Sequence, residues 1–556
     1  VTVTSITLTR SDDVVVSGVS AAELVDFAKL SDVAEMVSNT AIPIGTYKSV
    51  TVNLDYTNAL LFLNVNGVPK PTTIVGADGK ALTTVAITVT LDPANQLTIK
   101  QSGAQRLNLD FNLAASNHID TTASPIKVTA TPFITLNNDP ANTKPVRVRG
   151  PLISYSSLQN SYTVYVRPFL DEANTLGTLT LFGTPTSSYV IDNVGFSGNS
   201  GINAVTNLST GVVTSTLATF TPDSSAGSFN IVQAYLGTAV ESTTADRIEG
   251  TVIARTGDTL TLRGSTLSLK AGTFAYYPAD ATVSLAAATA VSVDGQPLAT
   301  GIDKSDISVG QHLMAFGTST VTSGVVALDA TAGRVRLMST RAWGTVMAGA
   351  SGSASLNLAA LGPWPAAAFN FAGTGTSAAQ NADPASYLLS TDATDHAALV
   401  GQLAAADGIV APFGAAPPDF LATALTPAAS LDTALEVEFT SGGSKTPFSS
   451  VSSTTLVVDL ADPNLGTVHR LRAGPVLTDL NSTTSPSIVA SASGRSTFAI
   501  GSAAAGVKVF SKFSDFVTEL NSTTTAAKAV ARVVAAGRYD AATGTLTASA
   551  IEVVLQ

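Results

Sequence analysis

The 556-residue chain contains no cysteine, and charged residues make up only 12% of it. Without cysteine there is no disulfide bond, no thiolate metal ligand and no cysteine nucleophile. Globular proteins contain about 25% charged residues on average, so this chain has roughly half the usual share. The lack of cysteine suits an exported bacterial protein whose folding needs no disulfide machinery.

The few charges are mostly acidic. The chain has 40 Asp and Glu against 29 Lys and Arg, which gives a net charge of −11, and its pI is about 4.8. No run of basic residues occurs. Because nucleic acids and anionic membranes are bound by clustered Lys and Arg, the sequence predicts neither a nucleic-acid partner nor adhesion to anionic lipid.

Long apolar runs are also missing. No run reaches the roughly 20 residues of a membrane-spanning helix, so we predict no transmembrane segment. The chain begins with the strand-like alternation Val1–Thr9 and shows no signal peptide. We expect the mature form of a protein that is extracellular or at the cell surface, with an upstream lipid anchor left open.

Short stretches that alternate with a period of two residues, separated by closely spaced turn residues, fill most of the chain. The most regular unit is Arg247–Leu337, which contains the motif Gly250-Thr-Val. The motif recurs at Gly344 and Gly466, and a looser version occurs at Gly150. Such alternation is typical of short strands in sandwiches or small barrels. Ser20–Leu30 has near-helical spacing of its apolar residues and predicts a helix.

We therefore predict a mainly β protein of serial β-sandwich and small β-barrel-like modules with a few short helices. The predicted units are an N-terminal sandwich-like domain at residues 1–145 and four β-modules at 146–246, 247–340, 341–460 and 461–556. In the last unit, Thr478–Thr484 and Thr518–Thr524 nearly repeat each other.

Two segments of the N-terminal unit, Ile42–Asp55 and Leu107–Ser116, carry a resemblance to known proteins. They resemble an uncharacterised sandwich-like domain found near the N-termini of many bacterial lipoproteins and secreted proteins. The resemblance covers about residues 3–135, although Asn112 stands where an acidic residue is expected. Ser308–Gly317 resembles the inner strands of small barrel domains, also of unknown function, that are common in bacterial exported proteins. Both resemblances imply an exported protein.

No pattern of catalytic or metal-binding residues is present. The four histidines, His118, His312, His396 and His469, lie in different regions and lack the short spacing of zinc ligands. There is no Gly-x-Ser-x-Gly motif and no phosphate-binding Walker loop. We predict no catalytic, cofactor-binding or metal-binding residue, no cofactor and no enzymatic activity.

Two acidic groups were weighed against simpler explanations. Glu436 and Glu438 share one face of a strand and are the nearest pair of carboxylates for glycoside hydrolysis, but a solvated strand face explains them better. Asn137–Asp139 and the run Asp462–Asn464, shortly after Asp459, offer oxygen ligands for calcium, and ordinary Asx turns explain them at least as well.

The segment Ala342–Ala382 contains no charged residue and holds both tryptophans of the chain, Trp343 and Trp364. A surface without charge is usually buried or meets a partner. The sequence leaves open whether this segment packs on neighbouring modules of the same chain or binds another molecule.

We expect a structural protein of the bacterial surface or extracellular space, a subunit of a filament or surface assembly. Self-association, or binding of other surface proteins, would use Val1–Thr9 or Ile551–Leu555 as added edge strands, or the segment Ala342–Ala382. The alternative is a polysaccharide-binding surface protein that uses exposed aromatic side chains such as Tyr276, Tyr277 or Trp364.

Overall fold

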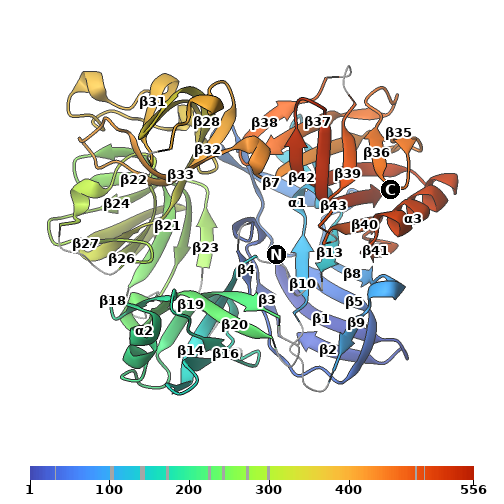
Figure 1. Ribbon diagram of the computed structural model, residues 1–556, viewed down its shortest axis with the longest axis horizontal. Helices are drawn as coiled ribbons and strands as arrows, with labels where there is room; N and C mark the ends of the chain where they lie inside the picture. The colour runs from blue at the N-terminus through green and yellow to red at the C-terminus, as the bar shows by residue number, and fades with distance from the viewer. Residues whose placement is uncertain are drawn as a thin grey trace.

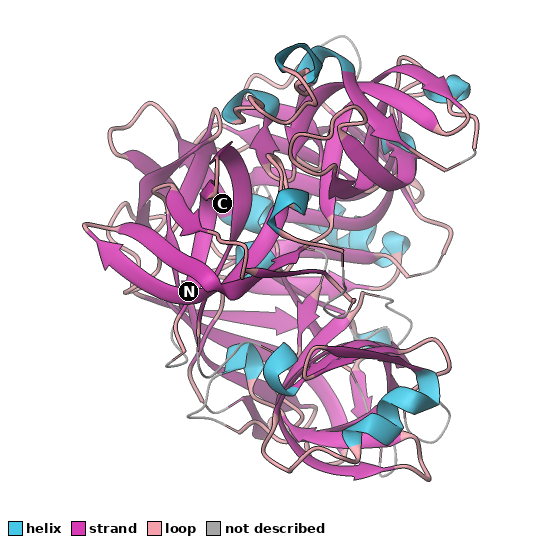
Figure 2. Cartoon of the chain, turned by 90° about the vertical axis from the view of Figure 1, so that its left-hand side faces the viewer, coloured by secondary structure: helices cyan, strands magenta, loops and turns pink. Residues whose placement is uncertain are grey.

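The computed structural model describes the whole chain except residues 20, 32, 101–105, 138–143, 171–174, 223–226, 241–244, 271–273, 297–300, 393, 482–484, 494 and 527. The described residues form 43 β-strands and three α-helices, so the prediction of a mainly β protein with a few short helices is confirmed. Strands run through every part of the molecule (Figure 2). The α-helices are α1 (Leu113–Ser116), α2 (Gly198–Val205) and α3 (Phe513–Thr525). The 3₁₀ turns are η1 (Phe27–Lys29), η2 (Pro93–Asn95), η3 (Pro168–Leu170), η4 (Gly237–Ala239), η5 (Lys304–Asp306), η6 (Ala366–Ala368), η7 (Ala378–Gln380), η8 (Pro384–Ser386), η9 (Ala397–Leu399) and η10 (Ala428–Ser430).

Three successive units, here called modules 1, 2 and 3, are closed five-stranded barrels with one strand order. In each barrel the first strand pairs with the second and the fourth, and a parallel pairing of the third and fifth strands closes the barrel. This is the Greek-key order of OB-type barrels. The first to fifth strands are β14 (Val146–Ser156), β15 (Ser161–Tyr165), β16 (Thr178–Phe182), β19 (Val213–Thr221) and β20 (Ser228–Leu236) in module 1; β21 (Asp246–Thr256), β22 (Thr259–Ser268), β24 (Ala281–Ser284), β26 (His312–Thr322) and β27 (Val325–Leu337) in module 2; and β28 (Thr340–Ala350), β29 (Ser353–Leu361), β31 (Tyr387–Ser390), β32 (Leu403–Val410) and β33 (Phe420–Pro427) in module 3. Shorter strands extend these sheets: β4 (Ala34–Glu35), β17 (Ser188–Ile191), β18 (Val194–Ser197), β23 (Phe274–Tyr277), β25 (Ala290–Val293) and β30 (Trp364–Pro365).

The glycine of the Gly-Thr-Val motif lies where the first strand of a barrel bends across the second. Gly250 and Gly344 sit at irregularities in that strand pairing. A Cβ atom at Gly344 would lie 2.4 Å from the carbonyl oxygen of Asn357, and one at Gly150 would lie 1.7 Å from that of Tyr165. A side chain does not fit at such a close backbone approach. The motif therefore marks the bend that lets each small barrel close.

The N-terminal domain is a sandwich whose larger layer continues into the end of the chain. Its core joins residues of β5 to residues of β13, so the layers pack face to face. The strands of the larger layer are β1 (Thr2–Arg10), β2 (Val15–Val19), β3 (Glu23–Leu24), β5 (Gly45–Asp55), β8 (Thr84–Thr90) and β9 (Leu97–Ile99). The smaller sheets contain β6 (Phe62–Val65), β7 (Val68–Val75), β10 (Asn108–Phe111), β11 (Asn117–Asp120), β12 (Ile126–Ala130) and β13 (Ile134–Asn137).

The last unit, module 4, begins earlier than the predicted border at residue 461. β34 pairs with β37 and β42, and Leu435, Val437 and Phe439 on β34 belong to the core of this unit. The motif glycine Gly466 lies on β37 rather than on the first strand. The strands are β34 (Thr433–Phe439), β35 (Phe448–Val451), β36 (Thr455–Val458), β37 (Leu465–Ala473), β38 (Val476–Asp479), β39 (Ser487–Ala490), β40 (Thr497–Ser502), β41 (Gly506–Phe510), β42 (Val530–Asp540) and β43 (Thr545–Leu555).

Module 4 and the N-terminal domain share one 16-stranded sheet. β41 pairs in parallel with β8, through Val507 opposite Val89 and Lys508 opposite Thr90. The core of the N-terminal domain also includes Val507 and other side chains of module 4. The first and last units are thus joined, and the five units close into a ring (Figure 1).

The charge-free segment packs on neighbouring modules of the same chain. Trp364 is 5% exposed and lies over the backbone of Gly264 in module 2, while Trp343 is 4% exposed and lies over Gly474 in module 4. The side chain of Asn64 in the N-terminal domain donates a hydrogen bond to the carbonyl oxygen of Pro363. Of the two interpretations left open by the sequence, both tryptophans support packing within the chain.

The structure differs from two other predictions made from the sequence, a helix at Ser20–Leu30 and free edge strands at the two ends of the chain. The helix predicted at Ser20–Leu30 is wrong, because Glu23 pairs with Val3 as strand β3 and only the short turn η1 follows; Ser20 itself lies outside the described residues. Val1–Thr9 forms most of β1 and Ile551–Leu555 ends β43, and both strands have paired neighbours on both sides. Neither strand presents an unpaired edge to another molecule in this structure.

We predict that Gly264→Ala and Gly474→Ala destabilise the protein more than Gly352→Ala. All three glycines have a left-handed backbone, with φ of 67°, 56° and 81°, so the backbone strain is comparable. A Cβ at Gly264 or Gly474 would lie 2.4 or 2.3 Å from a tryptophan ring, whereas none of the described atoms lies within 4 Å at Gly352. Such overpacking costs about 1–3 kcal/mol beyond the strain.

Calorimetry and tryptophan emission test this prediction together, because the chain has only two tryptophans and both lie at these contacts. The two clashing variants should show a lower melting temperature and a red-shifted emission. Equal losses of stability in all three variants would contradict the tryptophan contacts.

Candidate functional site

A large cavity lies at the centre of the ring. Its volume is about 3640 Å³, and its lining comes from the N-terminal domain and from each of the four modules. In Figure 1 the five units are arranged around the centre of the molecule. Small-molecule pockets usually measure about 300–1,000 Å³, so the central cavity has room for a larger ligand.

The central cavity gathers the basic residues of an acidic protein. Sixteen of the 29 Lys and Arg line it, against nine of the 40 Asp and Glu, as counted over the described residues. The lining therefore carries an excess of seven positive charges in a chain whose net charge is −11. A wall of one charge sign in a cleft raises the local concentration of ligands of the opposite sign.

The repeated strand pattern places arginines in the cavity. Arg147, Arg247 and Arg341 each occupy the second position of the first strand of their barrel, and all three line the cavity. Their neighbours on the opposite face, such as Val148 and Ile248, are fully buried in the barrel cores. Because side chains alternate along a strand, the same alternation that fills each core turns the arginines toward the ring centre.

Four arginines at the border of modules 1 and 2 form an electrostatically coupled group, here called the arginine cluster: Arg147, Arg149, Arg247 and Arg336. Three acidic side chains lie near it, and each has other partners. Glu35 also accepts a hydrogen bond from the backbone of Phe169, and Glu249 pairs with Lys29. Asp294 accepts hydrogen bonds from Tyr235 and Gln233. With Lys29 included, five basic groups face three acidic ones.

The positive charge of this region is only partly compensated. Within the described chain, the side chains of Arg147 and of the nearby Arg167 make no hydrogen bond and no ion pair, and Nε of Arg167 is buried. Burial lowers the pKa of Arg247 to about 10, and the neighbouring arginines act in the same direction. Uncompensated buried charge is costly, so an anion bound here would be stabilised by several guanidinium groups at once.

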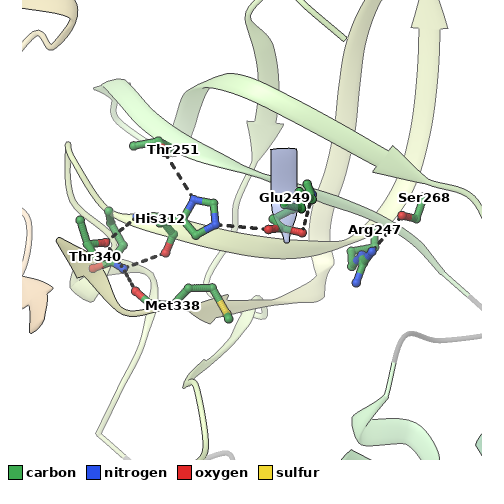
Figure 3. Close-up of polar contacts among 9 residues, drawn as sticks. Arg247, Glu249, Thr251, Ser268, His312, Met338 and Thr340 are labelled. Atoms are coloured by element: carbon green, nitrogen blue, oxygen red, sulfur yellow. Dashed lines mark hydrogen bonds and ion pairs between the residues drawn. The ribbon is translucent and has the colours of Figure 1, made fainter. Parts of the chain in front are cut away.

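Glu249 on β21 links the arginine cluster to the N-terminal domain (Figure 3). Its Oε2 lies 2.9 Å from Nζ of Lys29, and its Oε1 lies 3.3 Å from Nε2 of His312. Burial by itself raises the pKa of Glu249, but Lys29, then His312 and Arg247, outweigh it and hold that pKa well below its usual range. Glu249 is therefore ionised near neutral pH and serves as a fixed counter-charge.

The order Thr251, His312 and Glu249 places a hydroxyl, an imidazole and a carboxylate in a row (Figure 3). The Thr251 hydroxyl lies 3.4 Å from Nδ1 of His312, but Thr251 is only 2% exposed. A substrate has no access to a hydroxyl buried in this way, so the row offers no nucleophile. The arrangement holds charge in place, and the absence of enzymatic activity stays a prediction.

Glu436 and Glu438 line the cavity, but they are not on a solvated strand face as the sequence suggested. They are 5% and 9% exposed, respectively. Glu436 forms ion pairs with Arg470 and Arg472, whose Nε atoms lie 2.9 and 2.6 Å from its carboxylate oxygens. Glu438 lies 2.9 Å from Nδ1 of His118. The two carboxylates are ion-paired wall residues, because β34 turns this face toward the ring centre.

The other histidines and the calcium candidates named from the sequence lie apart from the arginine cluster. His396 is near Asp392 at 3.4 Å, and the ring of His469 contacts a backbone carbonyl oxygen. Asp459 and Asp462 accept backbone hydrogen bonds two residues ahead, as Asx turns do. Of the other calcium candidate, Asn137–Asp139, only Asn137 is described. Over the described residues, no three His, Asp or Glu side chains come together as metal ligands.

The aromatic residues proposed for sugar binding differ in their position. Trp364 is buried against module 2, so it offers no stacking surface. Tyr276 lines the cavity and packs on Phe62, with ring centres 4.9 Å apart. Tyr277 packs beside the core of module 2.

Sequence reasoning missed the arginines of the cavity, although a local signal was present. Each lies three residues before the motif glycine, as Arg147 before Gly150, Arg247 before Gly250 and Arg341 before Gly344. Read with the two-residue period of a strand, this spacing places each arginine on the face opposite the core. Composition does not show this signal, because it counts residues without their positions. The three arginines are also about one hundred positions apart, so they form no local basic run.

We predict that the contact between His118 and Glu438, which joins the N-terminal domain to module 4, stabilises the protein at acidic pH. The hydrogen bond to Glu438 is the largest cause that raises the pKa of His118 above its usual value of 6.5. The contact is therefore fully stabilising below about pH 6.5 and weakens as the pH rises through the raised pKa.

His118→Gln should lower the melting temperature at about pH 6 and have little effect at about pH 9. His469→Gln is the matched control, since its ring contacts a carbonyl oxygen and no carboxylate. A His118→Gln deficit that does not depend on pH would refute the role of the charged pair.

Among the described residues, no helix is both long enough and apolar enough to cross a bilayer. Comparisons of the chain with protein-family models, with curated proteins and with solved structures find no match. The resemblance to domains of bacterial lipoproteins and exported proteins therefore stays a prediction, and the function has to be argued from the cavity.

Proposed function

We propose that this chain is a binding protein of the bacterial surface or extracellular space, and that it holds an anionic ligand in the central cavity. The observation that carries the proposal is the concentration of basic side chains on the cavity wall of an otherwise acidic protein. The location is part of the proposal and rests on the resemblance of the sequence to exported proteins.

The arginines of the cavity differ in whether they have a partner within the chain, and this difference supports ligand binding over a purely structural role. Arg341 forms a two-pronged ion pair with Asp407, at 2.7 and 3.0 Å, and so fastens one strand to another. The side chains of Arg147 and Arg167 make no hydrogen bond and no ion pair within the described chain, yet both line the cavity. Guanidinium groups without a partner are suited to bind carboxylate, phosphate or sulfate oxygens.

We predict that inorganic tripolyphosphate, a compact multivalent anion, binds to the protein and that the double variant Arg147→Gln/Arg167→Gln binds it at least about tenfold more weakly. A hydrogen bond to a charged group contributes about 1.5–3 kcal/mol, and this variant removes two such donors. Isothermal titration calorimetry at low and at physiological ionic strength measures the affinity, which should fall as salt increases.

Arg538→Gln is the matched control, because Arg538 is exposed on β42 and does not line the cavity. It should leave binding unchanged. The double variant should fold about as stably as the original protein, since within the described chain neither side chain makes a hydrogen bond or an ion pair that the change would break. Equal binding by the original protein and the double variant would overturn the proposal.

A second candidate is the structural role expected from the sequence, in which copies of the chain assemble through an exposed sheet edge. β2 ends the large sheet and, among the described strands, pairs only with β1; Val14 and Val15 at this edge are 45% and 62% exposed. An exposed apolar edge strand is a template for pairing with another chain.

We predict that, if assembly is the function, the protein forms filaments at high concentration and Val15→Lys abolishes them. A lysine on an edge strand opposes pairing through its charge. Leu421→Lys is the control, because Leu421 is 36% exposed on β33 and pairs with Ser390 on one side and with Ile409 on the other. Electron microscopy that finds only single particles of the original protein would remove this candidate.

A further inference from the structure

The N-terminal domain contributes an apolar wall to the central cavity. Four leucines line it while remaining exposed to solvent, and we call them the leucine wall: Leu24, Leu60, Leu109 and Leu113, which are 45%, 68%, 37% and 40% exposed. They come from β3, the loop before β6, β10 and α1. Exposed apolar side chains that gather in one concave place mark a binding surface.

The leucine wall and the basic residues come from different parts of the chain. Twelve of the sixteen basic residues of the cavity come from residue 146 onward, outside the N-terminal domain. The lining of the N-terminal domain is mostly apolar and includes Phe27 and Phe111, whose ring centres are 4.6 Å apart. The cavity therefore has an apolar side and a basic side.

The two sides meet at the turn η1. At one end of η1, Phe27 packs on Phe111, which lies on β10 two residues after Leu109 of the leucine wall. At the other end, Lys29 pairs with Glu249, which is two residues from Arg247 on β21. Only the three-residue turn η1 lies between these two contacts, so one ligand can contact the leucine wall and reach the arginine cluster.

We propose that the ligand of the central cavity is an anionic amphiphile, with its apolar chain on the leucine wall and its acidic group at the arginine cluster. This inference rests on the proposed function and names the class of ligand. An acidic polysaccharide is less suited, because Trp364 is buried and the leucine wall offers a sugar chain no hydrogen-bonding group. Burying the leucines under an apolar chain would be favourable in proportion to the area covered.

Two fluorescent probes that differ by one sulfonate test the inference. 8-Anilinonaphthalene-1-sulfonate is an anionic amphiphile, and N-phenyl-1-naphthylamine is the same ring system without the charge. We expect the sulfonate probe to bind at least about tenfold more tightly, because only it engages the arginines. Sodium laurate should displace it, and uncharged monolaurin at the same concentration should not.

Variants of the basic side and of the leucine wall separate the contributions of charge and of apolar contact to probe binding. Arg147→Gln/Arg167→Gln should weaken the sulfonate probe about tenfold and leave the neutral probe unchanged. Leu60→Asp should weaken both probes, while Leu158→Asp, at a site that is 96% exposed and outside the cavity, should weaken neither. Unfolding of a variant is monitored by its melting temperature, and the Leu158 variant controls for the added charge.

The outcomes distinguish this inference from the proposed function. Suppose that tripolyphosphate binds but the two probes bind equally, or that Leu60→Asp does not change probe binding. The proposal of an amphiphilic ligand is then wrong, and the proposed anion site stands. If the probes bind and the arginine variant affects neither tripolyphosphate nor the sulfonate probe, both proposals fail.

Discussion

The parallel pairing of β8 with β41 is the contact on which the arrangement of the whole chain depends. It joins strands more than four hundred residues apart, Val89 to Val507 and Thr90 to Lys508, and it makes one sheet of the first and last units. Modules 1 to 4 alone would form an open row of barrels, and this pairing, together with the shared core and the contact of His118 with Glu438, joins the far end of the row to the N-terminal domain. With it, the row closes and its inner faces line a common cavity.

The local parts of this structure could be predicted from the sequence, and the long-range parts could not. Two-residue alternation and the Gly-Thr-Val motif indicate small barrels, because both depend on neighbouring residues and on one close backbone approach. The near-repeats Thr478–Thr484 and Thr518–Thr524 show the limit: the first begins at the end of strand β38, and the second lies in helix α3. In α3, Phe516 and Leu520 bury one helical face in the core of module 4, so packing outweighs local preference.

The candidate site was hidden for a similar reason. A net charge describes the whole chain, and the prediction of no polyanionic partner treated the basic residues as dispersed. The fold gathers them instead, by placing at least one arginine of each barrel on the outer face of its first strand, and the acidic residues remain mainly elsewhere. The paired carboxylates Glu436 and Glu438 were correctly placed on one strand face, but only the closed ring shows that this face meets Arg470, Arg472 and His118.

Ring closure also restricts how such a protein can change in evolution. An open row of repeated barrels can lengthen or shorten by duplication or loss of a unit, because each unit contacts only its neighbours. Here an added barrel would separate β41 from β8 and displace the tryptophans of module 3 from the glycines on which they pack. The number of modules is thus set by the geometry of the closed ring.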